Sequence, residues 1–269
     1  MAKLPKTSPG VGEKPAKPGD QLTATRKVDL AAALSSESTY VAFDTWIVGL
    51  SPLIVHAWSH KSKREMLTKQ VKAVRGTGKE KRNPDQDFVD SLYPMPTKNG
   101  KTGYGFPATG MKKAILSAAH KDKGLARSIV LSSLWLNAQW VSVKTAFEGA
   151  ICDLPLVRIY GSEPQMREDM VKIGAGLSKV ANLAYRAQFT VWAIRLTGRF
   201  NEANMTDAAL AFLVRDSGLA NGIGEWRNEK SGMFGSFKLA TAEEGERWQA
   251  YADGRGPLPV YEDLPIAAE

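Results

Sequence analysis

The residues with the clearest chemical potential lie in a glycine-rich stretch at residues 221–235. Four glycines there surround one indole ring and two cations. Glycine permits positive φ and removes side-chain bulk, so successive backbone N–H groups can converge on phosphate oxygens while Arg and Lys add charge. This combination suits a nucleic-acid backbone better than a small metabolite; the alternative is an ordinary helix-to-strand loop with one packed Trp. The predicted contacts are Gly222, Gly224, Trp226, Arg227, Lys230, Gly232 and Gly235.

A second set of candidate phosphate contacts lies on a predicted helix at residues 59–74. This segment contains no Gly or Pro, and Met66, Leu67, Val71 and Val74 recur at helical spacing. Its other face carries six cations against Glu65 alone, so we predict contact with phosphates rather than a merely solvated face. The cations are Lys61, Lys63, Arg64, Lys69, Lys72 and Arg75.

Candidate catalytic and metal-binding residues are sparse. His56 and His60 lie four residues apart where a helix begins, but the residues between them lack the catalytic Glu of a zinc-protease helix. Asp85, Asp87 and Asp90 follow a turn and are more simply surface acids than metal ligands. The sequence has no Ser-His-Asp set, nucleotide-triphosphate loop or paired-carboxylate motif. We therefore predict no catalytic residues, no metal and no cofactor.

Composition indicates a globular protein with an anionic partner. The 269 residues are 24% charged and 43% hydrophobic, with a formal net charge of +8. This basic balance favours nucleic acid or an anionic membrane surface, of which we expect nucleic acid. The sequence has no internal disulfide, because Cys152 is the single cysteine, and no apolar run near the roughly 18 residues that span a bilayer. Without a hydrophobic signal core, the protein is predicted to be soluble and cytoplasmic.

Charge divides the chain into three predicted regions. Residues 1–38 form a flexible basic arm, whose first part contains six cations, two acids and four prolines. Residues 39–239 form the nucleic-acid-binding domain, with a polar insertion at about residues 76–105. Residues 240–269 are predicted to be an acidic tail, exposed to solvent or in contact with a neighbouring subunit.

The order of predicted elements favours an α+β fold. A strand with a kink at Gly49 and Ser51-Pro52 and a short extension, at 39–55, precedes the basic helix and the insertion. Helices at 108–119 and 206–217 flank strands at 129–143, 151–160 and 184–200. Residues 166–174 are predicted to be a short helix or turn, and a last strand follows the glycine-rich loop. We predict a ferredoxin-like or RNA-recognition-motif-like sheet with helices on one face.

Element order and glycine placement make the chain resemble the RAMP superfamily over residues 39–239. The shared features are Gly49-Leu50-Ser51-Pro52-Leu53-Ile54 on an early strand, a basic helix after it, and a glycine-rich loop between the final helix and a late strand. The likeness is to the backbone-subunit branch, whose members polymerise along guide RNA in CRISPR interference complexes. It implies that the loop lies near bound RNA and that residues 76–105 form a thumb that wedges between groups of nucleotides. A phage or mobile-element relative fits equally well.

These features predict a non-catalytic protein that binds single-stranded nucleic acid, RNA favoured, and oligomerises along it as a backbone or coating subunit. The expected assembly is a helical filament or a ring, alone or with other subunits of a ribonucleoprotein, and the expected setting is antiviral defence or a phage. One alternative is a phage protein that binds or anneals single-stranded DNA. The other is an RNA-processing endonuclease of the RAMP type, for which His56 or His60 with Lys61 is the candidate base.

Overall fold

The computed structural model describes residues 40–71, 83–97, 100, 102–119, 125–173 and 180–260. The chain separates into two units, Met1–Ser38 and Thr39–Glu269, and every element below belongs to the second. The predicted basic arm and the last residues of the predicted acidic tail therefore lie outside the described residues. Among the described residues, no helix has the length and apolar character needed to cross a membrane.

Four strands and two helices form the centre of the fold. The strands lie in the order β11-β1-β10-β7, and each neighbouring pair is antiparallel. With the two helices, this is the βαββαβ arrangement of a ferredoxin-like fold. The predicted α+β class is confirmed. In chain order the elements are β1 (Tyr40–Gly49), α4 (Ala108–Ser117), β7 (Asp153–Gly161), β10 (Trp192–Asn201), α6 (Asp207–Asp216) and β11 (Phe237–Leu239).

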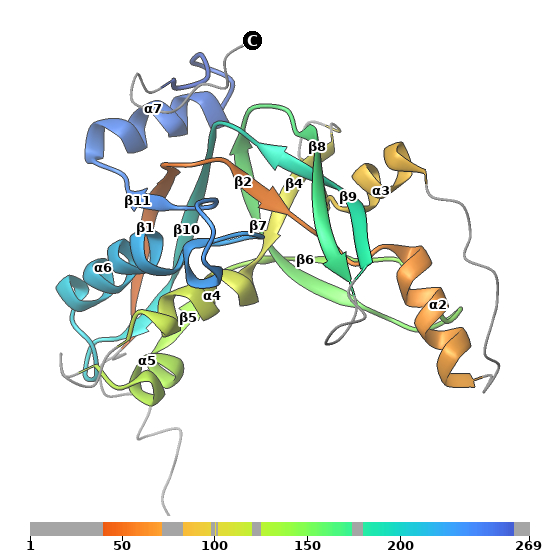
Figure 1. The fold of residues 1–269 in the computed structure, drawn as a ribbon. Coiled ribbons are helices and arrows are strands. Elements are labelled where there is room, and N and C mark those ends of the chain that lie inside the picture. Colours follow the sequence, from red (N-terminus) through yellow and green to blue (C-terminus); the bar gives the residue numbers. More distant parts are fainter. Residues whose placement is uncertain are drawn as a thin grey trace, which may run out of the picture. The chain divides into compact units, whose positions relative to one another are not determined.

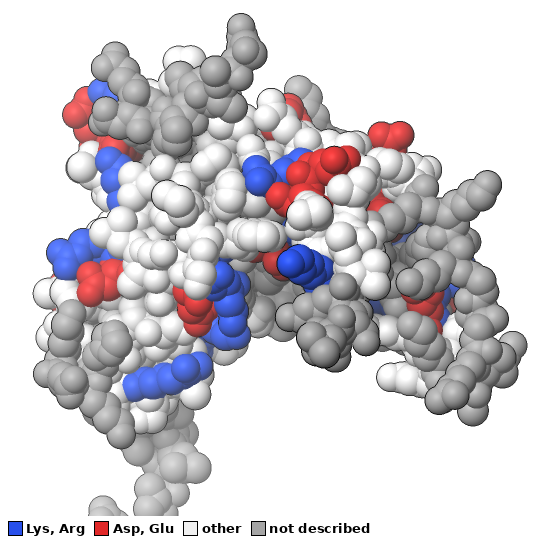
Figure 2. All heavy atoms as spheres, in the orientation of Figure 1, with Lys and Arg blue, Asp and Glu red and all other residues white. Residues whose placement is uncertain are grey.

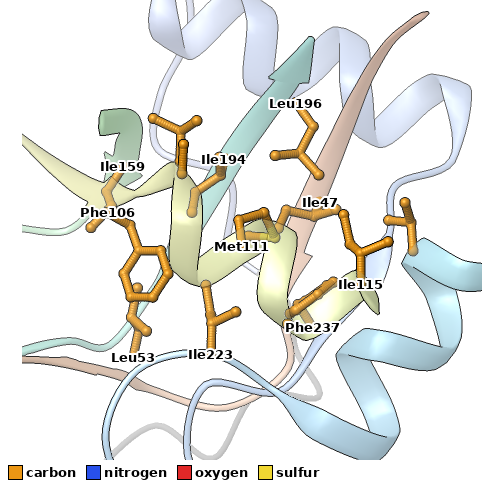
Figure 3. Close-up of a cluster of buried hydrophobic side chains, with 14 of the residues drawn as sticks. Ile47, Leu53, Phe106, Met111, Ile115, Ile159, Ile194, Leu196, Ile223 and Phe237 are labelled. Atoms are coloured by element: carbon orange, nitrogen blue, oxygen red, sulfur yellow. The ribbon is translucent and has the colours of Figure 1, made fainter. Parts of the chain in front are cut away.

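The main core lies between this sheet and helices α4 and α6, which cover the same face (Figure 1). Ile47 of β1 is paired with Ile194 of β10, and both are fully buried in one cluster with Met111 and Ile115 of α4 (Figure 3). Side chains alternate between the two faces of a strand, so the neighbours of Ile47 in β1 and of Ile194 in β10 point to the opposite face of the sheet. Helices α4 and α6 therefore lie on one face of the sheet, as predicted.

The opposite face is partly covered by a helix that the sequence did not predict, α7 (Ala242–Ala252). Thr241 caps its first turn in a capping box with Glu244, which satisfies backbone N–H groups at the helix start. Trp248 of α7 is fully buried in a cluster with Trp46 and Val48 of β1. The first part of the predicted acidic tail is thus a packed helix, because one apolar face outweighs its acidic exterior.

Two long segments that were each predicted to be a single strand contain more than one element in the structure. Residues 129–143 span α5 (Arg127–Ser133), β5 (Leu134–Leu136) and β6 (Gln139–Ser142), and the two strands pair with β10 and β7 respectively. Residues 184–200 span the end of β9 (Val180–Phe189) and most of β10, which belong to separate sheets. A turn at residues 190–191 separates β9 from β10. The predictions of single strands were wrong because apolar alternation continues across both breaks.

A second sheet has the order β2-β9-β8, where β2 is Leu53–Val55 and β8 is Gln165–Ile173. Strands β8 and β9 pair from Gln165 opposite Gln188 to Ile173 opposite Val180. The helix or turn predicted at 166–174 was therefore wrong. A long antiparallel ladder satisfies the backbone of this polar segment, whose own residues show no strong strand pattern.

The basic helix is present as α2 (His60–Val71), but neither Met66 nor Leu67 of its predicted apolar face is buried, while the side chain of Val71 and residue Val74 lie outside the described residues. Met66 is 45% exposed, and the helix is held instead through contacts made by His60 and Lys63. In the predicted insertion, Asn83 caps α3 (Pro84–Asp90) by accepting from the N–H groups of Asp85 and Gln86. The insertion also supplies β3 (Pro94–Pro96) and the start of β4 (Thr102–Pro107), which extend the main sheet beyond β7.

Candidate nucleic-acid interface

The glycine-rich loop lies where the sequence predicted it, between the end of α6 and β11. A π-helical turn, η3 (Ser217–Asn221), leads into it, and a 3-10 turn, η4 (Asn228–Lys230), lies in its middle. Gly222, Gly224 and Gly235 have φ of 66°, 81° and 65°, which side chains disfavour. Trp226 adopts φ 53° without being glycine. The loop therefore has a specific, tightly turned backbone.

The close approaches that these glycines permit are made to the protein itself. A Cβ on Gly232 would lie 1.7 Å from the carbonyl oxygen of Trp226, and one on Gly235 would lie 1.7 Å from that of Ile223. A Cβ on Gly224 would lie 2.4 Å from the oxygen of Ile54 in β2. The loop needs its glycines to fold against itself and β2, and these close contacts are explained without a ligand.

Several loop N–H groups are also used internally. The N–H of Ile223 donates to Gly235, that of Glu225 to Ile54, and that of Gly235 to Pro52. Because these donors are occupied, they are not available to converge on a phosphate. Any anion near the loop must be held mainly by side chains.

Arg227, predicted as a phosphate contact, is already paired within the loop. Its Nε donates to Glu229 at 2.9 Å, and its Nη1 donates to the carbonyl oxygen of Gly224 at 3.0 Å. The hydrogen bond from Arg227 holds the pKa of Glu229 below its usual range. Lys230 is exposed and forms no ion pair among the described residues, although its charge also contributes to lowering the pKa of Glu229. The two predicted cations of the loop therefore differ in availability.

A groove of about 280 Å³ separates the loop from the first turns of α4. Gly222 and Arg227 line it from the loop, and Thr109, Gly110 and Lys113 line it from α4. Helix α4 begins directly after Pro107 without a side-chain cap, so its first N–H groups and positive dipole end lie at this groove. Trp226, next to the groove residue Arg227, is 43% exposed.

Lys113 is a groove residue that the sequence did not single out. Lys112 and Lys113 are neighbours on one helix, and the local sequence has no signal to separate them. In the structure Lys112 donates to the carbonyl oxygens of Leu131 and Leu134, and its burial lowers its pKa. Lys113 lines the groove and has no ion pair within the described part of the chain. Tertiary contacts alone distinguish the two.

His56, Tyr93 and Glu225 meet at one end of the groove. His56 Nδ1 lies 3.6 Å from Glu225 Oε1, and the Tyr93 hydroxyl donates to the His56 carbonyl oxygen at 3.3 Å. Interaction with the His56 imidazole lowers the pKa of Glu225 despite the opposing effect of burial. Burial, and next the charge of Glu225, raise the pKa of Tyr93. A titratable pair therefore lies beside the loop.

The structure gives a partial account of the six predicted cations of α2. Lys63 donates to the carbonyl oxygen of Lys144 at 3.0 Å, so it anchors the helix, while Arg64 is exposed. Lys72 and Arg75 lie outside the described residues, as do the side chains of Lys61 and Lys69. The described contacts of α2 thus lead to residues 144–145 rather than to the groove.

Charge on the face that bears the groove is mixed. Figure 2 shows basic and acidic side chains interspersed over this face, with no single uninterrupted basic band among the described residues. Within the same residues, no group of three or more His, Cys, Asp or Glu side chains is placed to hold a metal ion. Compared with known proteins, the chain matches no family model, no curated protein and no solved structure at a significant level.

Proposed function

We propose that this protein binds single-stranded nucleic acid, RNA in preference to DNA, in the groove between the glycine-rich loop and α4, and does not turn it over. The observation that carries the proposal is the set of groups in and beside this groove. Lys113 lines it and forms no ion pair among the described residues, α4 presents an N-terminus without a side-chain cap, and Trp226, next to the groove residue Arg227, is an exposed ring. Cations hold phosphates by counterion release, and rings stack on bases of any sequence.

The fold supports this proposal. A ferredoxin-like sheet with a glycine-rich loop before its last strand is the arrangement on which the RAMP resemblance rests. The proposed setting is accordingly the cytoplasm, in antiviral defence or in a phage.

Self-association along the strand is the second part of the proposal. Two separate elements expose large apolar side chains: Met170 and Val180 lie on the β8–β9 hairpin, and Trp140, Phe147 and Ile151 lie on or after β6. Exposed apolar groups of this size are typical of protein interfaces. Two different patches on one chain favour a heterologous contact, which propagates as a filament unless it closes into a ring.

The first experiment is purification without nuclease, followed by particle sizing and digestion of any bound nucleic acid with RNase or DNase. We expect elongated particles that RNase dissolves. Particles that only DNase dissolves would instead support the single-stranded DNA alternative, and annealing of complementary strands without ATP would identify a recombination protein. A nucleic-acid-free monomer would contradict the proposal.

The second experiment tests the groove directly. The double variant Lys113→Ala and Lys230→Ala should weaken binding of single-stranded RNA across all sequences and flatten its salt dependence by about two phosphate contacts. The matched control, Arg247→Ala with Arg255→Ala, removes two exposed positive charges from α7 and the residues after it. Equal losses in the two double variants would show that only net charge matters and that the groove is not the binding track.

One observation favours a second candidate, RNA cleavage. His56 lies beside Glu225 at the groove, an arrangement in which a carboxylate orients an imidazole for proton transfer. A single cleavage site in RNA that disappears in His56→Ala but persists in His60→Ala would establish this activity. Intact RNA after long incubation at high protein concentration would remove it.

A further inference from the structure

The outer face of the main sheet, opposite α4 and α6, carries a second and larger cavity. Helix α7 covers one part of this face through Trp248. Beyond α7 the face stays open as a groove of about 680 Å³, within the range of small-molecule sites. Its floor comes from β7, β10 and the junction between β5 and β6, and Gln249 of α7 lines one side. The groove belongs to a different face from the loop and α4.

Arg158 on β7 is the distinctive group in this groove. Its guanidinium carbon lies 4.7 Å from the centre of the Tyr160 ring, and Tyr160 is itself held by an edge contact with Trp46. The side chain is thus held in place by an aromatic ring.

No acceptor among the described residues satisfies this guanidinium. Arg158 has no ion pair there, and its Nε is buried without a hydrogen-bond partner. The other groove cation, Arg195, is paired with Asp44. Buried polar groups normally have partners, so an oriented and unpaired guanidinium indicates a missing anion. Asp253 also lines the groove, but its carboxylate is paired with Arg255. Arg158 is therefore the charged side chain of this groove that has no ion pair among the described residues.

The groove wall at the β5–β6 junction supplies a different chemistry. The side-chain amides of Asn137 and Gln139 are exposed there and have no partner among the described residues. Each amide offers both donors and an acceptor, as the edge of a nucleobase does. A ligand with an anionic group for Arg158 and a nucleobase for the two amides would use both parts of the groove.

We infer that this groove binds a nucleotide, with its phosphate on Arg158 and its base edge on Asn137 and Gln139. The source is either a free mononucleotide or the terminal nucleotide of a strand, since both carry the same chemistry. The open face of a related sheet binds nucleotides in RNA-recognition motifs, where aromatic rings stack the bases. Here a guanidinium and amides take that place. The site does not depend on the proposed groove at the loop.

The test is calorimetric titration of the full chain, washed free of nucleic acid in high salt, with the four ribonucleoside 5′-monophosphates. At least one should bind with a stoichiometry of one, and Arg158→Gln should weaken it about tenfold or more, the loss of a charge-assisted contact. The control Arg199→Gln removes an exposed cation of β10 that does not line the groove, and should change affinity less than twofold, since only non-specific charge is lost.

A second variant guards against misfolding of Arg158→Gln. Asn137→Ala with Gln139→Ala alters exposed side chains, and should weaken binding about threefold or more while changing which base binds best. The proposal is overturned if no monophosphate binds at millimolar concentration, if inorganic phosphate binds as tightly, or if Arg158→Gln matches Arg199→Gln.

Two further arms separate the sources and the two sites. If a 5′-phosphorylated decamer binds more tightly than its 5′-hydroxyl counterpart, and Arg158→Gln abolishes the difference, the ligand is a strand end. If the two decamers bind with equal affinity while mononucleotide binding depends on Arg158, the ligand is a free nucleotide. The variant Lys113→Ala with Lys230→Ala should leave mononucleotide binding intact. If that variant fails to bind long RNA but still binds mononucleotide, the outer-face site is unaffected. If Arg158→Gln fails to bind mononucleotide but still binds long RNA, the groove at the loop is unaffected.

Discussion

The groove beside the glycine-rich loop and the groove on the outer sheet face are each lined by one arginine in an ion pair and one Lys or Arg without an ion pair among the described residues. In the loop Arg227 is paired with Glu229 while Lys113 across the groove is unpaired. On the outer face Arg195 is paired with Asp44 while Arg158 is unpaired. The comparison teaches that the number of cations near a site does not measure its capacity for anions. Pairing decides it, because a neutralised guanidinium gains little from a phosphate.

The regions also differ in the burial of their tryptophans, and replacing the buried one should give the largest loss of stability. Trp248→Ala should lower the free energy of unfolding by about 3–5 kcal/mol, because a fully buried ring is lost from between α7 and β1. Trp226→Ala, which removes a 43% exposed ring, should cost less than about 1 kcal/mol yet weaken binding of single-stranded RNA. Urea unfolding of both variants measures this, and similar costs would contradict the contrast.

The next effect concerns the loop backbone. Gly235→Ala should destabilise the protein by about 3 kcal/mol or more, because it combines positive φ with a Cβ only 1.7 Å from a carbonyl oxygen. The control Gly149→Ala also has positive φ, but nothing lies within 4 Å of its Cβ, so it should cost about 1 kcal/mol. Equal losses in chemical denaturation would mean that conformation, not close packing, requires the loop glycines.

A smaller effect should distinguish Arg227, which is paired, from Lys113, which forms no ion pair, at the groove beside the loop. Lys113→Met should weaken RNA binding about fivefold and reduce the salt slope by about one contact. Arg227→Met should leave the salt slope nearly unchanged, since it removes a charge that Glu229 already balances, although it exposes that carboxylate. Fluorescence anisotropy across a range of salt concentrations measures both. A steeper loss for Arg227→Met would show that its pairing breaks when RNA binds.

The smallest effect is a pH dependence at the end of the loop groove. The pKa of Glu225 is lowered in the folded protein, so its contribution to stability is present above the unfolded-state value of about 4.3 and is lost as the pH falls through the folded value. The pair is nearly half exposed, so we expect less than about 1 kcal/mol. The thermal stability of wild type relative to Glu225→Gln should therefore fall between pH 5 and pH 3, conditions chosen to bracket that range. A constant difference would show that the His56 contact does not stabilise the carboxylate.

Local features of the sequence were enough to predict several elements correctly. The predicted helix at 206–217 is present as α6, and Thr206, a residue type that favours the N-cap position, accepts from the N–H of Ala209 at its start. The glycine-rich loop was located between the last core helix and the last strand, because glycine spacing and helix caps act within a few residues. The α+β class followed from the alternation of these local signals.

Other features depended on contacts between distant parts of the chain. Strand β8 has a polar sequence with no clear period and becomes a strand through pairing with β9. The acidic segment that forms α7 is ordered because Trp248 packs against Trp46, which lies about two hundred residues earlier in the chain. Neither partner is visible from the local sequence, and burial of a large ring outweighs the charge of its neighbours.

The sequence by itself determined which residues could carry charge and rings, and it placed the tight turns that glycine permits. Only the tertiary structure decided which cations are free. Arg195 is paired with Asp44 and Lys112 donates to distant carbonyl oxygens, whereas Lys113 and Arg158 line grooves and form no ion pair among the described residues. The physical reason is that Coulomb and hydrogen-bond partners act over a few ångströms of space, at any separation along the chain.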